Sequence, residues 1–209
     1  MARNARRKSR SGVAVIEFSF SLLVLVPLVL GVFVYGFRLI YSLQMMQITR
    51  DLGHMYVEGI NFRNSGPISN AATLASGFNL TSNGTSVVIL SQITLETQAM
   101  CDAANIAPAG TPCTNLAKPV FIEQLTIGNT SCGASHFGTP PMTTINGVTN
   151  EVTVLSQATL ASAVANGFGS VLALNNGETA YVAEMVNQTP SLNIPGFSGA
   201  PLVYSRTIF

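Results

Sequence analysis

The chain has 209 residues and a formal net charge of +1, with only 9% charged residues against 47% hydrophobic ones. This charge content is far below the roughly 25% of ordinary soluble domains, and the apolar content excludes a chain that is disordered for lack of hydrophobic residues. Five of the ten Lys and Arg lie within residues 1–10, whereas from residue 13 onward five bases face nine acids. A basic tail thus precedes a mildly acidic chain, on which no nucleic-acid-binding surface is expected.

Phe18–Phe37 is a run of 20 residues without a charged side chain. A helix of this length measures about 30 Å, the hydrocarbon thickness of a bilayer. The basic tail before it and the single Arg38 directly after it predict that the tail stays in the cytoplasm and the rest crosses the membrane. A cleaved secretory signal is disfavoured because its apolar region is normally about 7–15 residues long and ends in an A-x-A-like site. An uncleaved signal anchor stays open.

Glu17 lies at the entrance of this apolar run, where an ionised carboxylate is costly unless it is paired or hydrated. One interpretation leaves Glu17 at headgroup depth in contact with water. The other gives it a partner: a cut after Gly12 would make Val13 the new N-terminus and Glu17 the fifth residue. The α-amino group and the carboxylate would then meet within one helix or between adjacent subunits. Between subunits, the pair would fix the axial register of a helical assembly.

The segment Arg10–Phe18, followed by the apolar run, resembles the class III signal of type IV pilins and pseudopilins. It has a basic leader that ends in Gly12, four further residues, and then Glu17 with the aromatic Phe18. The Glu-aromatic pair and the proline-containing Leu/Val run are similar to the tight-adherence (Tad, type IVc) branch, specifically its TadE-like minor pilins. The C-terminal segments Tyr181–Val186 and Tyr204–Phe209 are similar to the C-terminal sequences of such proteins. The resemblance covers roughly residues 10–60 and 178–209, and the middle of the chain departs from it.

The resemblance implies that a prepilin peptidase cleaves the Gly12–Val13 bond on the cytoplasmic side and that Glu17 and Phe18 act in assembly. The other expected partners are the pilins and pseudopilins of the Tad machinery, inner-membrane platform proteins and the lipid bilayer. The implied function is a single-pass structural subunit of the bacterial inner membrane, built into or beneath a type IVc pilus for adhesion or secretion. We expect no enzymatic activity, cofactor, metal or nucleic-acid partner. The alternatives are a signal-anchored extracytoplasmic binding domain, which would keep residues 1–12, and an anchored enzyme.

The helical pattern continues beyond the apolar run as an amphipathic stripe with spacings of three and four. The stripe consists of Tyr41, Met45, Ile48, Leu52, Met55 and Tyr56. We expect one helix from about residue 12 to about residue 58, with the stripe packed on the chain's own sheet or shared with neighbouring subunits. The chain then divides into a basic leader (1–12), a transmembrane helix (13–37), an amphipathic stalk helix (38–60) and an extracytoplasmic β-rich domain (61–209).

Short β-rich runs follow among Gly, Ser, Asn and Thr. The expected strands are Ser86–Leu95, Val120–Ile127, Val152–Leu155, Thr179–Val186 and Leu202–Ile208, with a short helix near Gln157–Ala165. Period-two alternation assigns two sets of residues to buried faces. These sets are Phe121, Leu125 and Ile127, and Tyr181, Ala183 and Met185. The expected fold class is α+β: a long N-terminal transmembrane helix that continues as an amphipathic stalk and packs on a small antiparallel β-sheet, as in pilins.

The three cysteines lie in the segment that would be extracytoplasmic, where disulfides can form. Cys101 and Cys113 bracket a loop with two prolines, and a bridge between them would contribute about 3 kcal/mol. The alternative pairing is Cys113 with Cys132. Cys132 and His136 invite a metal or nucleophile interpretation, but two ligands are too few for zinc and a Cys/His dyad needs a third, orienting group. A loop cysteine and a solvated histidine are therefore expected.

Replacing Gly12 with Trp is expected to leave the leader attached, because a bulky side chain would obstruct the peptidase from reaching the Gly12–Val13 bond. Intact-mass spectrometry of protein from a host with a prepilin peptidase should show a Val13 terminus for the wild type only. Gly36→Ala, inside the apolar run, is the control that should be cleaved normally. A Val13 terminus in the Gly12→Trp protein would contradict the assigned cleavage site.

Overall fold

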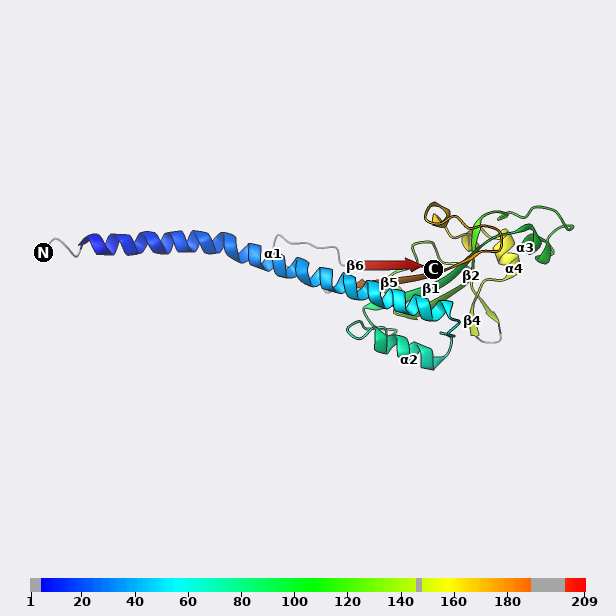
Figure 1. Ribbon diagram of the computed structural model, residues 1–209, viewed down its shortest axis with the longest axis horizontal. Coiled ribbons are helices and arrows are strands. Elements are labelled where there is room, and N and C mark those ends of the chain that lie inside the picture. The colour runs from blue at the N-terminus through cyan, green and yellow to red at the C-terminus, as the bar shows by residue number, and fades with distance from the viewer. Residues whose placement is uncertain (1–4, 146–147, 189–201) are drawn as a thin grey trace. The chain divides into compact units, whose positions relative to one another are not determined.

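The computed structural model describes the backbone of residues 5–145, 148–188 and 202–209 (Figure 1). Its longest element is helix α1 (Ala5–Val57), which has 53 residues and includes Pro27. The expected helix over residues 12–58 is thus confirmed, and it begins earlier than expected. Helix α1 contributes to two compact units. Residues up to Tyr41 belong to the first unit, and Ser42 begins the second, which holds the rest of the described chain.

The second unit contains an antiparallel sheet with the described strands in the order β3-β4-β2-β1-β5-β6. The strands are β1 (Ser86–Leu95), β2 (Pro119–Gly128), β3 (Thr143–Ile145), β4 (Val148–Glu151), β5 (Thr179–Gln188) and β6 (Leu202–Ile208). Strand β1 lies in the middle, with Leu90 opposite Leu125 of β2 and opposite Ala183 of β5. A long helix and an antiparallel sheet establish the α+β class.

The last turns of α1 pack on one face of this sheet. Their buried side chains recur at spacings of three and four residues, which places them along one side of the helix. The shared core contains Met45, Ile48, Leu52 and Tyr56 of the helix and Val88, Leu90, Leu125, Ile127, Ala183 and Met185 of the strands. Packing of the stripe on the chain's own sheet is therefore confirmed, although Tyr41, at its beginning, is exposed.

The opposite face of the sheet is buried as well. Its main core contains Ile93, Phe121, Ala180 and Val182 from the strands and Phe137, Val152, Ala163, Ala165 and Phe168 from the segments between β2 and β5. Those segments include three short 3₁₀ helices, Thr130–Cys132, Ala161–Ala163 and Phe168–Ser170. Strand β5 is consequently buried on both sides over most of its length. The alternation of its side chains in the sequence predicted the burial of only one of these sides.

Phe121 does not lie on the same face as Leu125 and Ile127, as was expected, because β2 contains a β-bulge. The β1–β2 register pairs Gln92 with Glu123 but Ile93 with Phe121, so Ile122 is an extra residue in β2. The extra residue shifts the alternation by one position. Leu125 therefore packs under α1, whereas Phe121 lies in the core on the opposite face.

The expected strand Val152–Leu155 was wrong, because helix α4 (Val154–Thr159) occupies its second half. The Thr153 hydroxyl accepts a hydrogen bond from the Ser156 N–H at 3.2 Å, which caps the helix N-terminus. The expected helix near Gln157–Ala165 is thus displaced toward the N-terminus, and a 3₁₀ turn follows it. The sequence prediction also missed α2 (Ser65–Leu74) and α3 (Gln98–Ala103), the latter capped by Thr97. Both helices are too short to show a clear period.

Gly128→Ala is expected to lower the free energy of unfolding by roughly 2–3 kcal/mol. Gly128 has φ +105°, and an added Cβ would lie 2.4 Å from the Ser86 carbonyl oxygen of the neighbouring strand. Thermal unfolding of the purified full-length protein in detergent measures the change. Gly177→Ala is the matched control, because Gly177 has φ +83° but nothing within 4 Å of an added Cβ. An equal loss in both variants would contradict the role of the close contact.

Candidate functional site

The residues assigned to processing and assembly lie on helix α1. Val13 and Glu17 are four positions apart, so their side chains occupy the same side of the helix. Val13 and Phe18 are 58% and 65% exposed. Among the described residues, Glu17 makes no ion pair. Glu17 is therefore available to a partner outside the described chain.

The Gly12–Val13 bond lies within α1, where a protease must unwind the backbone before it can cleave. Gly12 favours this unwinding, because glycine is about 1 kcal/mol less favourable than alanine in a helix interior. An added Cβ at Gly12 would meet nothing within 4 Å. Folding of the chain therefore does not require glycine at this position. A requirement for glycine here would come from an interaction with another protein.

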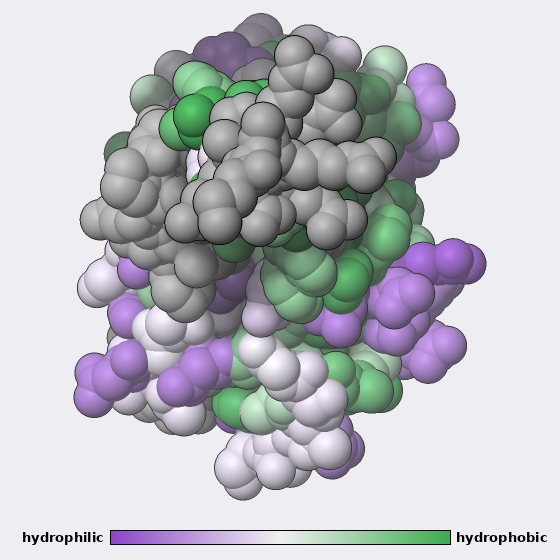
Figure 2. Space-filling model, turned by 90° about the vertical axis from the view of Figure 1, so that its left-hand side faces the viewer, coloured by the Kyte–Doolittle hydropathy of each residue, from purple (hydrophilic) through white to green (hydrophobic). Residues whose placement is uncertain are grey.

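One helix of the described residues is long and apolar enough to cross a membrane, and it lies near the N-terminus. No part of its most apolar stretch is buried against the rest of the protein. Most large apolar side chains from Val13 to Leu43 are exposed. Figure 2 shows hydrophobic surface, in green, beside hydrophilic surface, in purple, on the face that it presents. Soluble monomers rarely expose so large an apolar patch. Helix α1 is thus compatible with a single membrane-spanning anchor.

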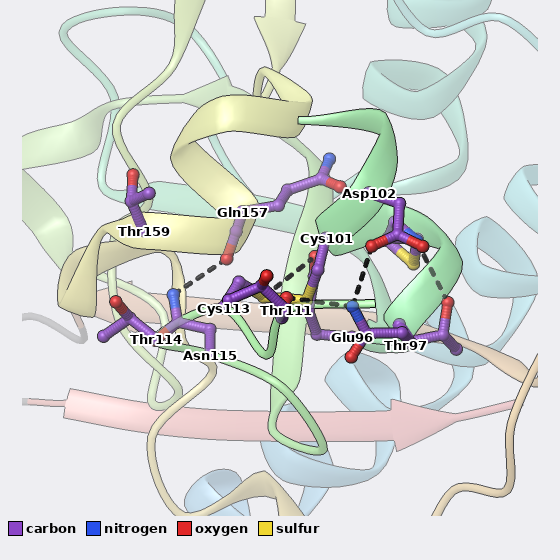
Figure 3. The surroundings of a disulfide bond; sticks show 12 residues. Glu96, Thr97, Cys101, Asp102, Thr111, Cys113, Thr114, Asn115, Gln157 and Thr159 are labelled. Carbon is purple, nitrogen blue, oxygen red and sulfur yellow. Dashed lines mark hydrogen bonds between the residues drawn. A yellow bond between two sulfur atoms is a disulfide. The ribbon is translucent and has the colours of Figure 1, made fainter. Parts of the chain in front are cut away.

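A disulfide joins Cys101 of α3 to Cys113, the pairing that the sequence favoured (Figure 3). Hydrogen bonds fix the loop between them: the Asp102 carboxylate accepts from the Gln98 side chain at 2.8 Å and from the Gly110 N–H at 2.9 Å. These two bonds lower the pKa of Asp102. The loop is therefore held by hydrogen bonds as well as by the bridge.

The side-chain amide of Asn115, just after the disulfide, attaches this region to α4 (Figure 3). It donates to the backbone carbonyls of Gln157 and Leu160, both at 2.8 Å. The disulfide loop and α4 are distant in sequence, so this attachment joins two segments that cover the same end of the sheet.

Glu96 is buried beside the disulfide, with its Oε1 atom 3.9 Å from the Cys113 sulfur. Its Oε2 atom has no hydrogen-bond partner among the described residues. Burial penalises the charged form and raises the pKa of Glu96 to about 7. The two sulfurs and the carboxylate lie within 4.8 Å of one another, but the sulfurs bond to each other and offer no thiolate to a metal ion.

Cys132 and His136 do not form a dyad. Cys132 is a free, buried cysteine that packs with Val87, Ile89 and Val186. Its thiol donates to the Gly84 carbonyl at 3.5 Å, and burial raises its pKa. The His136 ring instead lies 6.0 Å from the Tyr204 ring, measured between centroids. The pair therefore lacks the geometry of an activated nucleophile.

The loop that contains Cys132 and His136 donates hydrogen bonds to a buried carboxylate of strand β5 that the sequence prediction missed. Glu184 of β5 is fully buried and accepts three hydrogen bonds. The donors are the Ser135 hydroxyl, the His136 N–H at 2.9 Å and the Tyr204 hydroxyl at 2.5 Å. A buried carboxylate is tolerated when it is fully hydrogen-bonded. Glu184 thus fastens strand β6 and the loop to the middle of the sheet.

The cluster around Glu184 joins the two C-terminal segments, Tyr181–Val186 and Tyr204–Phe209. Glu184 lies opposite Arg206 in the β5–β6 register, and Tyr204 lies two residues before it on the same strand. Arg206 places its guanidinium 4.9 Å from the centre of the Phe137 ring. The sequence did contain a signal for this cluster, namely an acidic residue within the apolar run Tyr181–Val186. A charge in a buried strand needs a partner.

Comparisons with known proteins give no further assignment. No protein-family model, no curated protein and no solved structure matches the chain. The arguments for function therefore come from the residues and their geometry.

Glu96→Gln is expected to remove a loss of stability that the wild type shows as the pH rises. Between the ordinary pKa of 4.5 and the raised value of about 7, the unfolded state releases the Glu96 proton and the folded state keeps it. The free energy of unfolding of the wild type therefore falls across this window and levels off above it. Thermal unfolding of both proteins over the window measures the difference.

Glu178→Gln is the matched control, because two hydrogen bonds from Asn175 lower the pKa of Glu178. This carboxylate stabilises the fold above its unfolded pKa, and the contribution is lost as the pH falls through the lowered pKa. Its replacement should change the profile in the opposite direction. Identical pH profiles for the wild type and Glu96→Gln would contradict the assignment for Glu96.

Proposed function

We propose that the chain is a TadE-like minor pilin or pseudopilin that takes part in the assembly of a type IVc pilus for adhesion or secretion. It is inserted in the bacterial inner membrane with its N-terminus in the cytoplasm and its β-rich domain outside. A prepilin peptidase removes residues 1–12, and the mature protein joins other pilins and the platform proteins of the machinery. This role requires neither catalysis nor a cofactor.

One observation carries the proposal: α1 has two different apolar surfaces in succession. Up to Leu43 most of its large apolar side chains are exposed, and from Met45 onward an apolar stripe is buried in the core of the domain. The first surface needs a cover that the described residues do not supply, either lipid or other apolar helices. In a subunit that is first inserted in the membrane and later assembled into a helical bundle, lipid covers this surface first and neighbouring helices cover it afterwards.

The position of Glu17 supports assembly over simple anchoring. A plain anchor gains nothing from a carboxylate at the entrance of its apolar run, because an unpaired charge there is costly. The attraction between a carboxylate and an ammonium group is far stronger in apolar surroundings than in water. The α-amino group that cleavage would create at Val13 is such a partner, and a pair between adjacent subunits would set their spacing.

Glu17→Gln is expected to be cleaved normally and to reach the membrane, but to enter pili at least about tenfold less than the wild type, the equivalent of ~1.4 kcal/mol. The amide keeps the shape of the carboxylate and removes its charge. Immunoblots of sheared pili and of membranes measure the distribution. Glu58→Gln, at an exposed acid just after α1, is the control. Normal incorporation of Glu17→Gln would remove the proposed role.

The terminal residue of the mature wild-type protein separates this proposal from the alternative of a signal-anchored binding domain. A processed pilin begins at Val13, whereas an unprocessed anchor retains the basic leader. Peptide sequencing of the protein from native membranes decides between them. A retained leader in the wild type would overturn the pilin proposal.

A further inference from the structure

The buried carboxyl group of Glu96 lies next to both sulfurs of the Cys101–Cys113 disulfide (Figure 3). Glu96 is only 1% exposed, and its Oε2 atom has no hydrogen-bond partner among the described residues. A buried polar group without a partner costs stability, and a role in redox chemistry is one reason for which proteins retain such a group. A disulfide has no proton to donate to this carboxyl group, whereas the two thiols that reduction would form can donate.

The other charged side chains of this region have partners of their own. The Asp102 carboxylate accepts two hydrogen bonds, and the Lys118 ammonium donates to the Thr114 carbonyl at 2.8 Å. Helix α4, which packs against α3, carries no charged residue. Burial alone raises the pKa of Glu96 to about 7. The Glu96 carboxyl group is thus able to hold and release a proton near neutral pH beside the two sulfurs.

The two cysteines differ in exposure. Cys101 is buried, whereas Cys113 is half-buried. Both line a cavity of about 110 Å³ together with Ile106, Thr111 and Thr159, and its described lining contains no charged side chain. One water molecule needs roughly 10–15 Å³ of such space. The cavity therefore admits a small thiol or the tip of one cysteine side chain from another protein.

The segments that carry the two cysteines are held together without the bridge. The Asp102 carboxylate joins Gln98 of α3 to Gly110 in the loop, and Gln98 also donates to the Thr111 carbonyl at 2.9 Å. The side chain of Asn115 attaches the chain after the loop to α4. None of these hydrogen bonds uses a sulfur atom. Reduction of the bridge therefore leaves the two thiols close enough for the bridge to form again.

We propose that Cys101–Cys113 is an exchange-active disulfide that accepts two electrons from a dithiol, and that Glu96 supplies the proton for the buried sulfur. A thiolate of the dithiol attacks the half-buried Cys113 sulfur, the S–S bond breaks, and Cys101 leaves with the bonding electron pair. A thiolate is costly at the buried Cys101, so Glu96 transfers its proton to that sulfur as the bond opens. The inference does not rest on the pilin proposal.

The second thiol of the dithiol completes the reaction. After losing its proton to water, it attacks the dithiol's own sulfur in the mixed disulfide, and Cys113 leaves with the electron pair and takes a proton from water. The dithiol is thereby oxidised to a disulfide, Cys101 and Cys113 are reduced to thiols, and Glu96 regains a proton from water. In the reverse direction the Glu96 carboxylate removes the proton from Cys101 as this sulfur attacks the mixed disulfide.

The proposal is tested by reducing the full-length protein, in detergent, with dithiothreitol. Free thiols are alkylated under denaturing conditions and counted by mass spectrometry, where the free Cys132 adds one constant label. The rate constant is measured on both sides of the Glu96 pKa of about 7 and divided by the thiolate fraction of dithiothreitol. For the wild type this quotient should be about tenfold higher below that pKa than above it, because the neutral acid donates a proton and the carboxylate does not.

Glu96→Gln should give a quotient that does not change with pH and that equals the value of the wild type at high pH. A purely structural role of Glu96 would instead change the quotient by the same factor at every pH. Glu178→Gln, at a carboxylate with its own hydrogen bonds from Asn175, should keep the wild-type profile. The same pH dependence in the wild type and Glu96→Gln, or a bridge that dithiothreitol does not reduce in the folded protein, would overturn the proposal.

Cys101→Ser and Cys113→Ser test which sulfur is attacked, and they do so independently of Glu96→Gln. Both variants lose the bridge, but the first keeps the half-buried Cys113 thiol and the second keeps the buried Cys101 thiol. Glutathione disulfide should form a mixed disulfide about tenfold faster with Cys101→Ser than with Cys113→Ser, because the exposed thiol ionises and is reached more readily. Equal rates, or the reverse order, would contradict the assigned step.

Discussion

The packing of the last turns of α1 on the central strands is the contact on which the rest of the structure depends. It buries Met45 and Leu52 completely, and full burial of each such side chain contributes about 1.5–3 kcal/mol. These turns belong to α1, which is one continuous helix over Ala5–Val57.

The same helix faces two different environments in succession. Between Phe18 and Phe37 it is apolar on all sides, as expected for a segment within lipid or a helical bundle. Beyond Leu43 the apolar residues narrow to one stripe, and polar residues such as Gln47, Arg50 and Asp51 are exposed on the other side. The stripe needs an apolar surface to pack on, and β1, β2 and β5 supply it.

The sheet is held from its other face by polar as well as apolar contacts. Glu184 is the centre of the polar contacts, because it bonds the loop at Ser135 and His136 and the strand residue Tyr204. In a buried strand such a carboxylate specifies which loop may cover it, since an apolar loop would leave its oxygens without donors. The two C-terminal segments, Tyr181–Val186 and Tyr204–Phe209, are thus joined by a polar contact between adjacent strands.

The sequence by itself determined the elements whose signal is local. The long apolar run and the stripe after it predicted α1, and β-rich runs between turn residues predicted Ser86–Leu95 and Leu202–Ile208 with their observed bounds. The short loop between Cys101 and Cys113 favoured the disulfide that the structure contains.

Only the tertiary structure decided the features that depend on residues distant in the chain. The bulge at Ile122 follows from the register of β1 against β2, and the burial of the second face follows from loops that fold back over it. The bonds of Glu184 join segments separated by many residues. Hydrophobic period reports which side of an element is apolar, but it carries no information on which distant segment covers that side.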